Sequence, residues 1–470
     1  MSEHRQSGRQ QRGTDRANPS SGRPPVEQVR VSRRDFLKLG SAGGLALLAG
    51  GGAATAPRPA AAIPTSARIV IAGGGAGGLT VASRLSSILD GAQITIVEPS
   101  DIHQYQPGFT LVAAGVYERH EVLTETGDFI PSGVDWIRAK VAEFDPDANR
   151  VTLDDGRDLD YDFLVVGTGC ELRFDLIEGM SRELVGREGI GCNYAGADGA
   201  AATWEQVQRF IERGGQGVFT TANTPIKCAG APLKATFLTE DLLRSEGNRD
   251  RAQFDLFQFG DRLFGVDTYH DLAAQRFDEK GVDYHYGYEF RAIDPGRRVA
   301  TFVHSEDGST QEVDYDYIHV TPPQTAPPAV RDSALPWQEG GFAEGGWMEV
   351  DQHTLQHGRF PNVFAIGDVA GTPIGKTAAT VRAHAPVVAD NLAALIQDQE
   401  PTAEFDGYTS CPLITAVGRA SLVEFDYTMQ QVSSLPFFDQ ESDRWIWWQV
   451  KVRGVKPLYY QMLRGRFLKT

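Results

Sequence analysis

The sequence is poor in cysteine, with only Cys170, Cys192, Cys228 and Cys411 among its 470 residues. Four cysteines scattered over this length cannot build the dense disulfide framework of a small secreted domain. None belongs to a C-x-x-C pair, so no metal site is predicted, and the C-x-x-C-H pattern of c-type haem attachment is also missing. Each cysteine therefore has to be considered individually.

Positive charge is also in short supply, because 45 Lys and Arg face 62 Asp and Glu and the net charge is −17 at pH 7. Nucleic-acid phosphates attract basic surfaces, so this balance argues against a nucleic-acid-binding protein. With 41% hydrophobic residues, the chain still has enough apolar material for two or three domains.

The N-terminal region lacks an apolar run long enough for a bilayer span. Residues 1 to about 31 are polar, and we expect them to be disordered. Ser32 to Lys38 carries two adjacent arginines and precedes Leu39 to Thr55, which is Gly/Ala-rich and shorter than the ~20 residues of a span. This pattern favours a twin-arginine signal, cleaved near Ala60 to Ala62, over a membrane anchor. It predicts export to the periplasm or to the outer face of the cytoplasmic membrane.

A glycine-rich turn after an apolar run is the strongest motif of the sequence. Gly73, Gly75 and Gly78 follow the run at G-x-G-x-x-G spacing, and helical spacing then begins. These glycines permit a tight turn, close approach of a pyrophosphate and close packing of helix on strand. A second apolar run ends in Glu98, 20 residues beyond Gly78, where a ribose-binding carboxylate is expected. The stretch predicts dinucleotide binding.

Two later segments are predicted to rejoin the same sheet. Tyr161 to Gly169 is a buried strand that ends in a Gly-x-Gly turn, and Asn362 to Asp368 is a strand that precedes an Ala-rich helix beginning at Lys376. Asp368 can bond a ribityl chain, while Lys376 and the helix N–H groups can stabilise a reduced flavin. The turn that contains Gln106 either approaches a flat cofactor ring or is a surface turn.

The next strand and helix lack this phosphate turn. We predict a strand over Gly215 to Thr221 and a helix over Lys234 to Arg244, but the loop Ala222 to Pro232 has two prolines and a single glycine. A nicotinamide site is therefore predicted to be absent, and Cys228 stands in the equivalent region. Asp314 to Pro323 is predicted to close this domain as an edge strand stopped by prolines.

The C-terminal segment Arg444 to Thr470 combines six aromatic residues with seven Lys or Arg and no acidic residue. Aromatic rings beside cations suit a membrane interface. The alternative is a C-terminal helix pair that covers the sheet, and both can hold if only one face is buried.

Four separated stretches carry a family likeness: Asn223 to Pro232, His319 to Pro323, Ala365 to Asp368 with Lys376 to Ala379, and Asp406 to Leu413. From about Ala67 onward the chain resembles the sulfide:quinone oxidoreductases, flavoproteins with two dinucleotide-binding domains that are related to flavocytochrome c sulfide dehydrogenase. The mitochondrial branch is the most similar. The resemblance implies FAD, sulfide oxidation at a cysteine beside the flavin, transfer of electrons to quinone and peripheral membrane attachment through the C-terminal region.

The resemblance also implies site residues. Cys228 is expected to carry the sulfur, and the flavin-binding positions correspond to Gly73, Gly75, Gly78, Glu98, Asp368 and Lys376. Gln106 and Gly169, in the turns described above, complete the predicted cofactor site.

One position departs from the family pattern, because Val369 stands where a second redox cysteine usually follows the Gly-Asp motif. Valine can neither form a disulfide nor hold a persulfide, so another cysteine replaces it or the sulfide reaction is altered. We favour Cys192 as the replacement. For Cys411 and Cys170, buried small hydrophobic roles are the simpler interpretation.

In the reaction that the resemblance implies, hydrosulfide attacks an oxidised sulfur at Cys228 and the displaced thiolate passes electrons to the flavin. Thiolate character is required, and Lys227 or Lys376 could lower the cysteine pKa. The sequence leaves open a c-type cytochrome acceptor, an NADH:quinone dehydrogenase and a non-catalytic flavin sensor. It also leaves open a homo-oligomeric state and covalent attachment of the flavin.

The predicted fold is α/β, with two Rossmann-like dinucleotide-binding domains, the FAD domain being split in sequence. The expected parts are a disordered arm and signal at 1–62, the FAD domain at 63–190 and 331–395, a second Rossmann-like domain with the redox cysteine at 191–330, and a C-terminal quinone- and membrane-associating region at 396–470.

Overall fold

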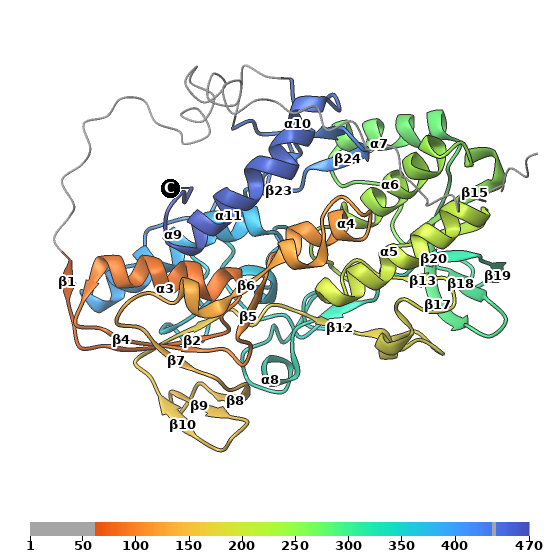
Figure 1. Ribbon diagram of the computed structural model, residues 1–470. Helices are drawn as coiled ribbons and strands as arrows, with labels where there is room; N and C mark the ends of the chain where they lie inside the picture. The colour runs from red at the N-terminus through yellow and green to blue at the C-terminus, as the bar shows by residue number, and fades with distance from the viewer. Residues whose placement is uncertain (1–61, 435–438, 470) are drawn as a thin grey trace, which may run out of the picture. The chain divides into compact units, whose positions relative to one another are not determined.

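The computed structural model describes residues 62–434 and 439–469 (Figure 1). The arginine pair and the Gly/Ala-rich stretch of the predicted export signal lie outside these residues.

The first domain is built on a five-stranded parallel sheet in the order β22-β11-β2-β4-β7. Its strands are β2 (Arg68–Ala72), β4 (Gln93–Val97), β7 (Asp135–Ile137), β11 (Phe163–Val166) and β22 (Val363–Ala365). The side chains of β2 beyond Arg68 are buried, which explains the apolar run seen in the sequence. Because β22 pairs with β11, two distant parts of the chain form one sheet, and the predicted split of this domain is confirmed.

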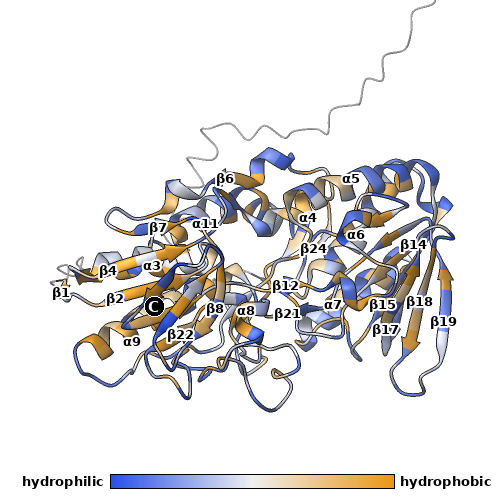
Figure 2. Cartoon of the chain, turned by 90° about the horizontal axis from the view of Figure 1, so that it is seen from below, coloured by the Kyte–Doolittle hydropathy of each residue, from blue (hydrophilic) through white to orange (hydrophobic). Residues whose placement is uncertain are grey.

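Two helices cover one face of this sheet, α3 (Ala76–Ile88) and α9 (Ala378–Ile396), and they lie side by side in Figure 1. An antiparallel layer of β8 (Val141–Asp145), β9 (Arg150–Leu153) and β10 (Asp158–Asp160) adjoins the domain. Strands β2 and β4 are largely orange in Figure 2, as expected for strands buried between layers.

The second domain repeats the parallel pattern in the order β13-β20-β14-β15-β16. Its strands are β13 (Ile190–Gly191), β14 (Gly215–Thr220), β15 (Ala252–Gln258), β16 (Asp283–Tyr286) and β20 (Tyr317–His319), and its helices are α5 (Gly196–Arg213), α6 (Ala231–Ser245) and α7 (Asp267–Lys280). A meander of β17 (Tyr288–Asp294), β18 (Val299–His304) and β19 (Thr310–Asp314) follows β16.

The prediction that the strand before the prolines lies at a sheet edge is wrong. Strand β20 is flanked by β13 on one side and β14 on the other. Strand β13 is only two residues long, too short for its sequence to give a strand signal.

Short elements complete the described part of the chain. They are β1 (Ile63–Pro64), β3 (Leu89–Asp90), β5 (Ile102–Gln104), α4 (Phe109–Val112), β6 (Leu123–Glu125), β12 (Glu171–Leu172), β21 (Gln324–Thr325), α8 (Pro328–Arg331), β23 (Thr409–Ser410), β24 (Leu413–Ala416), β25 (Arg419–Ser421) and β26 (Glu424–Phe425). Strands β12 and β21 pair antiparallel where the chain passes between the two Rossmann-like domains.

The C-terminal segment is helical from Trp445 to Leu463, as α10 (Trp445–Gln449), a π-helical turn (Val450–Gly454) and α11 (Val455–Leu463). Helix α11 packs on α3, and Ser83 Oγ donates to the Leu463 carbonyl at 2.7 Å. Trp447 and Tyr459 are buried, whereas Trp445 is 49% exposed. The segment therefore buries half of its six aromatic rings against the protein.

No helix within residues 62–434 and 439–469 combines the length and apolar character that a bilayer crossing requires.

Candidate redox site

The glycine-rich turn between β2 and α3 has a steric reason for two of its three predicted glycines, Gly73 and Gly78. Gly73 has φ of 103°, and a Cβ there would lie 2.6 Å from the Gly167 carbonyl oxygen. At Gly78 a Cβ would lie 1.8 Å from the Gly73 carbonyl oxygen, so α3 could not approach the strand. A Cβ at Gly75 would meet nothing within 4 Å. This open space lies at the N-terminal end of α3, where free N–H groups bind phosphate.

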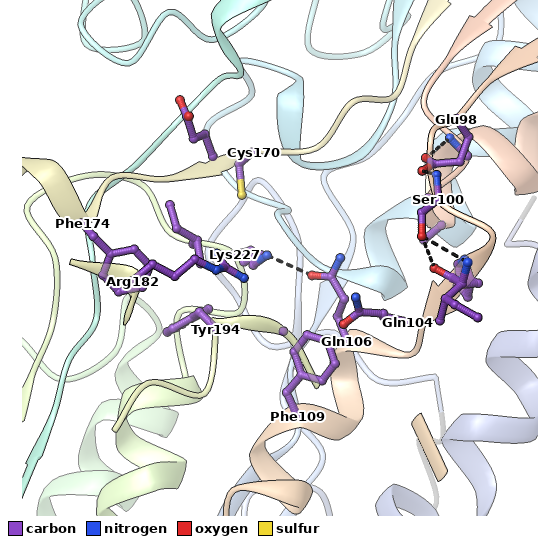
Figure 3. A pocket seen from close by; sticks show the side chains of 18 of the residues that line it. Glu98, Ser100, Gln104, Gln106, Phe109, Cys170, Phe174, Arg182, Tyr194 and Lys227 are labelled. Atoms are coloured by element: carbon purple, nitrogen blue, oxygen red, sulfur yellow. Dashed lines mark hydrogen bonds between the residues drawn. The ribbon is translucent and has the colours of Figure 1, made fainter. Parts of the chain in front are cut away.

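A cavity of about 750 Å³ opens at this turn (Figure 3). Gly75, Glu98 and Gln106 all line it, as the sequence predicted for a common site. Glu98 Oε2 accepts from Gly74 N at 2.8 Å, and Glu98 Oε1 accepts from Ser100 N at 2.9 Å. Gly169 has φ of 73° and immediately precedes Cys170, which lines the cavity.

These features fit FAD. The open space at Gly75 and the start of α3 suit a pyrophosphate, and the carboxylate at the end of β4 suits a ribose. The chain is an FAD-binding flavoprotein, and the turn residues, Glu98 and Gln106 are the ones that would hold the cofactor.

Lys376 and Asp368 lie together at the start of α9. Lys376 Nζ donates to the Asp368 carbonyl at 2.5 Å and to the Ala370 carbonyl at 3.1 Å, and it lies 3.6 Å from the centre of the Trp347 ring. Burial lowers the pKa of Lys376 to about 8 and raises that of the Asp368 carboxyl. The Lys376 carbonyl accepts from Cys228 N at 2.9 Å, which joins this region to the cysteine loop.

The loop between β14 and α6 forms no glycine-rich phosphate turn, as predicted. Helix α6 begins at Ala231, with Pro232 in its first turn, where proline is tolerated. Cys228 has φ of 50°, in the left-handed region that a non-glycine residue rarely adopts. Such strain is maintained where the surrounding structure fixes the residue, and it is frequent at functional sites.

Cys411 is the cysteine beside Cys228, so the preference for Cys192 is wrong in geometry. The two sulfurs lie 2.7 Å apart although the residues are 183 positions apart, and both are free thiols. Cys411 is buried before β24, while Val369 packs in an apolar core. Cys411 thus places a second sulfur beside Cys228, whereas Val369 has none.

The other two cysteines make no hydrogen bond with the pair, although Cys228 packs against the apolar cluster that contains Cys192. Cys192 is completely buried in an apolar cluster, and burial raises the pKa of its thiol to about 11. Cys170 Sγ donates to Gln324 Oε1 at 3.3 Å, and burial raises its thiol pKa to about 11 as well. Neither environment favours a thiolate. Within the described residues, no cluster of three or more His, Cys, Asp or Glu could hold a metal ion.

Lys234 is the cation of the cysteine pair, and sequence reasoning missed it. Its Nζ lies 3.0 Å from Cys228 Sγ and 3.3 Å from Cys411 Sγ, and the residue is 2% exposed. The predicted cations lie elsewhere, because Lys227 Nζ donates to Gln106 Oε1 at 2.9 Å and Lys376 faces carbonyls and Trp347. A signal existed, since Lys234 lies in the first turn of a helix that begins three residues after Cys228.

The charge of the pair is shared unequally. The hydrogen bond from Cys228 lowers the pKa of the Cys411 thiol well below its usual value, and the Lys234 ammonium adds to this effect. The same hydrogen bond, with burial, raises the pKa of Cys228. Burial lowers the pKa of Lys234, but the two sulfurs raise it further, so it stays charged. Both effects favour a thiolate at Cys411 over one at Cys228, next to a buried cation.

A second buried lysine reaches this region from the π-helical turn. Lys451 is 4% exposed, and its Nζ donates to the Pro107 carbonyl at 2.8 Å. Burial, reinforced by Lys234, lowers the pKa of Lys451 to about 8, while Cys228 and Cys411 act in the opposite direction. π-Helical turns are rare and frequently occur at functional sites. No local sequence signal connects Lys451 with the cysteines.

Two Rossmann-like domains, an FAD cradle and a thiol pair define an oxidoreductase of the pyridine nucleotide-disulphide class, and the family model "Pyridine nucleotide-disulphide oxidoreductase" matches residues 67–212. The chain is 37% identical over 399 residues to the mitochondrial sulfide:quinone oxidoreductase of Mus musculus, covering 84% of this chain and 86% of that protein. The Dictyostelium discoideum mitochondrial enzyme is also 37% identical, with coverage of 85% and 86%. The chain belongs to the sulfide:quinone oxidoreductase family.

A solved structure shares the fold. The sulfide:quinone oxidoreductase of Aquifex aeolicus superimposes with a TM-score of 0.73 at 20% identity, covering 85% of this chain and 92% of that one.

Proposed function

We propose that this chain oxidises sulfide at the pair Cys228 and Cys411 and passes the electrons through FAD to a quinone. The observation that carries the proposal is the position of Lys234, within 3.3 Å of both sulfurs. A buried ammonium at two adjoining sulfurs stabilises a thiolate, which is the leaving group and nucleophile of sulfur exchange.

The reaction begins with a disulfide between the two cysteines. Hydrosulfide attacks the Cys228 sulfur, so that Cys228 becomes a persulfide and Cys411 leaves as a thiolate beside Lys234. A nucleophilic acceptor then takes the outer sulfur, which leaves Cys228 as a second thiolate. Re-formation of the disulfide releases two electrons, and a quinone takes them up with two protons as quinol.

The chain's own residues prepare each step. FAD, when bound, relays the electron pair from the cysteines to the quinone. The Lys376 carbonyl accepts a hydrogen bond from Cys228 N at 2.9 Å and so fixes the Cys228 backbone. The preceding residue, Lys227, lines the cofactor pocket. Lys234 holds negative charge at the cysteines, and Lys376 offers positive charge beside Asp368 at the end of β22.

The test is an anaerobic titration of the purified holoprotein with sulfide, following flavin absorbance with and without added decylubiquinone. We expect bleaching by about one equivalent of sulfide and return of the absorbance when quinone is added. Bleaching by NADH instead would favour an NADH:quinone dehydrogenase. Reoxidation by cytochrome c but not by quinone would favour the cytochrome-linked alternative, and no bleaching by either reductant would favour a flavin sensor.

The chain's location is part of the proposal. The twin-arginine pattern supports export, and exposed Trp445 and Arg453 support peripheral contact with anionic lipid. Flotation with anionic vesicles tests the contact, and W445A is expected to weaken it while W447F serves as a buried control. Replacing Arg33 and Arg34 with lysine is expected to retain the protein in the cytoplasm.

A further inference from the structure

The C-terminal helix contributes a side chain to the wall of the cofactor pocket. Tyr459 in α11 and His103 in β5 both line the pocket, and they are only 6% and 5% exposed. The Tyr459 hydroxyl lies 2.8 Å from His103 Nε2, although the residues are 356 positions apart. A buried contact between such distant segments needs a reason beyond local folding.

Helix α11 is held on both sides of this contact. The Tyr459 ring packs edge-on against Tyr105, with centroids 4.9 Å apart, and the neighbouring Tyr460 stacks on Phe129 at 5.4 Å. One turn further on, Ser83 Oγ binds the Leu463 carbonyl at 2.7 Å. The Tyr459 hydroxyl is therefore presented to His103 at a fixed position.

His103 is neutral, which fixes the roles of its two ring nitrogens. Burial lowers the pKa of His103 to about 4, while the backbone of Gly74 opposes that shift by accepting a hydrogen bond from the ring. A neutral imidazole has one donor and one acceptor nitrogen. Burial also raises the pKa of Tyr459, so its hydroxyl keeps its proton and donates to Nε2. The remaining ring N–H then lies toward the Gly74 backbone, which opposes the fall in the His103 pKa.

Gly74 lies inside the phosphate-binding turn, and both of its backbone groups are engaged. Its N–H donates to Glu98 Oε2 at 2.8 Å, and its carbonyl faces His103. In a trans peptide the carbonyl and the next N–H point in opposite directions. Holding the Gly74 carbonyl on His103 therefore directs the Gly75 N–H away from the ring. Gly75 has open space beside it, at the start of α3.

We propose that Tyr459 and His103 are positioning residues for FAD. They orient the Gly74–Gly75 peptide so that its N–H faces the pyrophosphate, and they make the C-terminal helix a requirement for tight cofactor binding. The proposal rests on the FAD site alone. It stands whether or not sulfide and quinone prove to be the substrates.

The first test measures FAD binding to the full-length apoprotein by quenching of flavin fluorescence. We expect Y459F to bind FAD about 3- to 10-fold more weakly, because one hydrogen bond that orients a binding group is lost. Y460F is the matched control, because it removes the adjacent hydroxyl of the same helix outside the pocket, and its dissociation constant is expected to stay within about 2-fold of the wild type.

The second test asks whether the two residues act through one chain of hydrogen bonds. H103Q keeps a donor and an acceptor, so its FAD dissociation constant is expected to stay within about 3-fold of the wild type. H103L has neither group and is expected to bind FAD about 10-fold or more weakly. Adding Y459F to H103L should cause no further loss, because the hydroxyl then has no partner.

Two outcomes would overturn the proposal. One is wild-type FAD affinity in Y459F, and the other is full additivity of Y459F and H103L. Unfolding midpoints of the apoproteins separate this role from a purely structural one. A structural role would lower the midpoints of Y459F and leave the dissociation constant unchanged.

Discussion

The ammonium nitrogen of Lys234 lies 3.0 Å from the sulfur of Cys228, inside the protein. Lys234 comes from the first turn of α6, immediately after the loop that carries the cysteine, so one short stretch supplies both a sulfur and its cation. The partner sulfur arrives from Cys411, in the C-terminal part of the chain. The structure thus brings Cys411 to Cys228 and Lys234, which are already close to each other in the sequence.

Removing either sulfur of the pair should stop sulfide-dependent reduction. C228S and C411S are each expected to slow anaerobic flavin bleaching by more than about 10³-fold, because hydroxyl groups cannot form the required disulfide. C192S is expected to react like the wild type, since Cys192 is buried in an apolar cluster. Rapid-mixing absorbance measures all three, and a slow C192S with an active C411S would reverse the assignment.

Replacing Lys234 should shift the pH dependence of the reaction. In K234M the thiolate loses its cation, so the pKa that governs reaction moves upward and the bleaching rate at pH 7 falls about 10- to 100-fold. Raising the pH should recover part of the loss. K234R keeps the charge and should retain most of the rate at pH 7. An unchanged pH profile in K234M would remove the lysine from this role.

Lys451 should show opposite effects on stability and activity. Its folded pKa of about 8 lies below the unfolded value, so its buried charge destabilises the protein below pH 8 and this penalty disappears as the pH rises toward ~10.4. K451M is expected to raise the free energy of unfolding at pH 7 by about 1–3 kcal/mol and to slow sulfide-dependent bleaching about 10-fold.

Denaturant unfolding at pH 7 and pH 10 measures the stability effect, which should shrink at the higher pH. The pKa of Lys376 is also about 8, so both lysines lose their charge at alkaline pH, where the bleaching rate is expected to fall. The pH profiles of K451M and K376M therefore have to be compared. A destabilised K451M with normal kinetics would contradict the assignment.

Asp443 should anchor the C-terminal helix to the second domain. It is 3% exposed and accepts from Arg276 Nη2 at 2.8 Å and Arg419 Nη2 at 2.9 Å, with a further hydrogen bond from Thr415. D443N leaves Arg419 without a charged partner and Arg276 with Glu279 alone, and is expected to lower the free energy of unfolding by about 2–3 kcal/mol at pH 7.

The acid dependence gives a second signature of this anchor. Burial raises the pKa of Asp443, but its arginine and threonine partners lower it to about 2. The stabilisation is therefore present above the unfolded value of ~3.9 and is lost as the pH falls through about 2. D439N removes a more exposed carboxylate and should change little. Equal unfolding curves for D443N and the wild type would exclude the anchor.

Much of the first domain could be predicted because its signals are local. The turn at Gly73 to Gly78 spans only six residues, so spacing alone located it, although Gly73 is also constrained by the distant Gly167 carbonyl. The helix after Lys376 was found for the same reason. The two-residue strand β13 was missed because it has no periodicity of its own.

The amino-acid sequence by itself determined the cofactor turn, the lack of a second phosphate turn and the importance of Cys228, since each depends on neighbouring residues. Only the tertiary structure decided that Cys411 is the partner of Cys228, that Lys234 and Lys451 are the nearby cations, and that Tyr459 meets His103. Four cysteines allow several pairings, and burial of a lysine has no local signature. These contacts arise where packing brings distant segments together, and that depends on the whole fold.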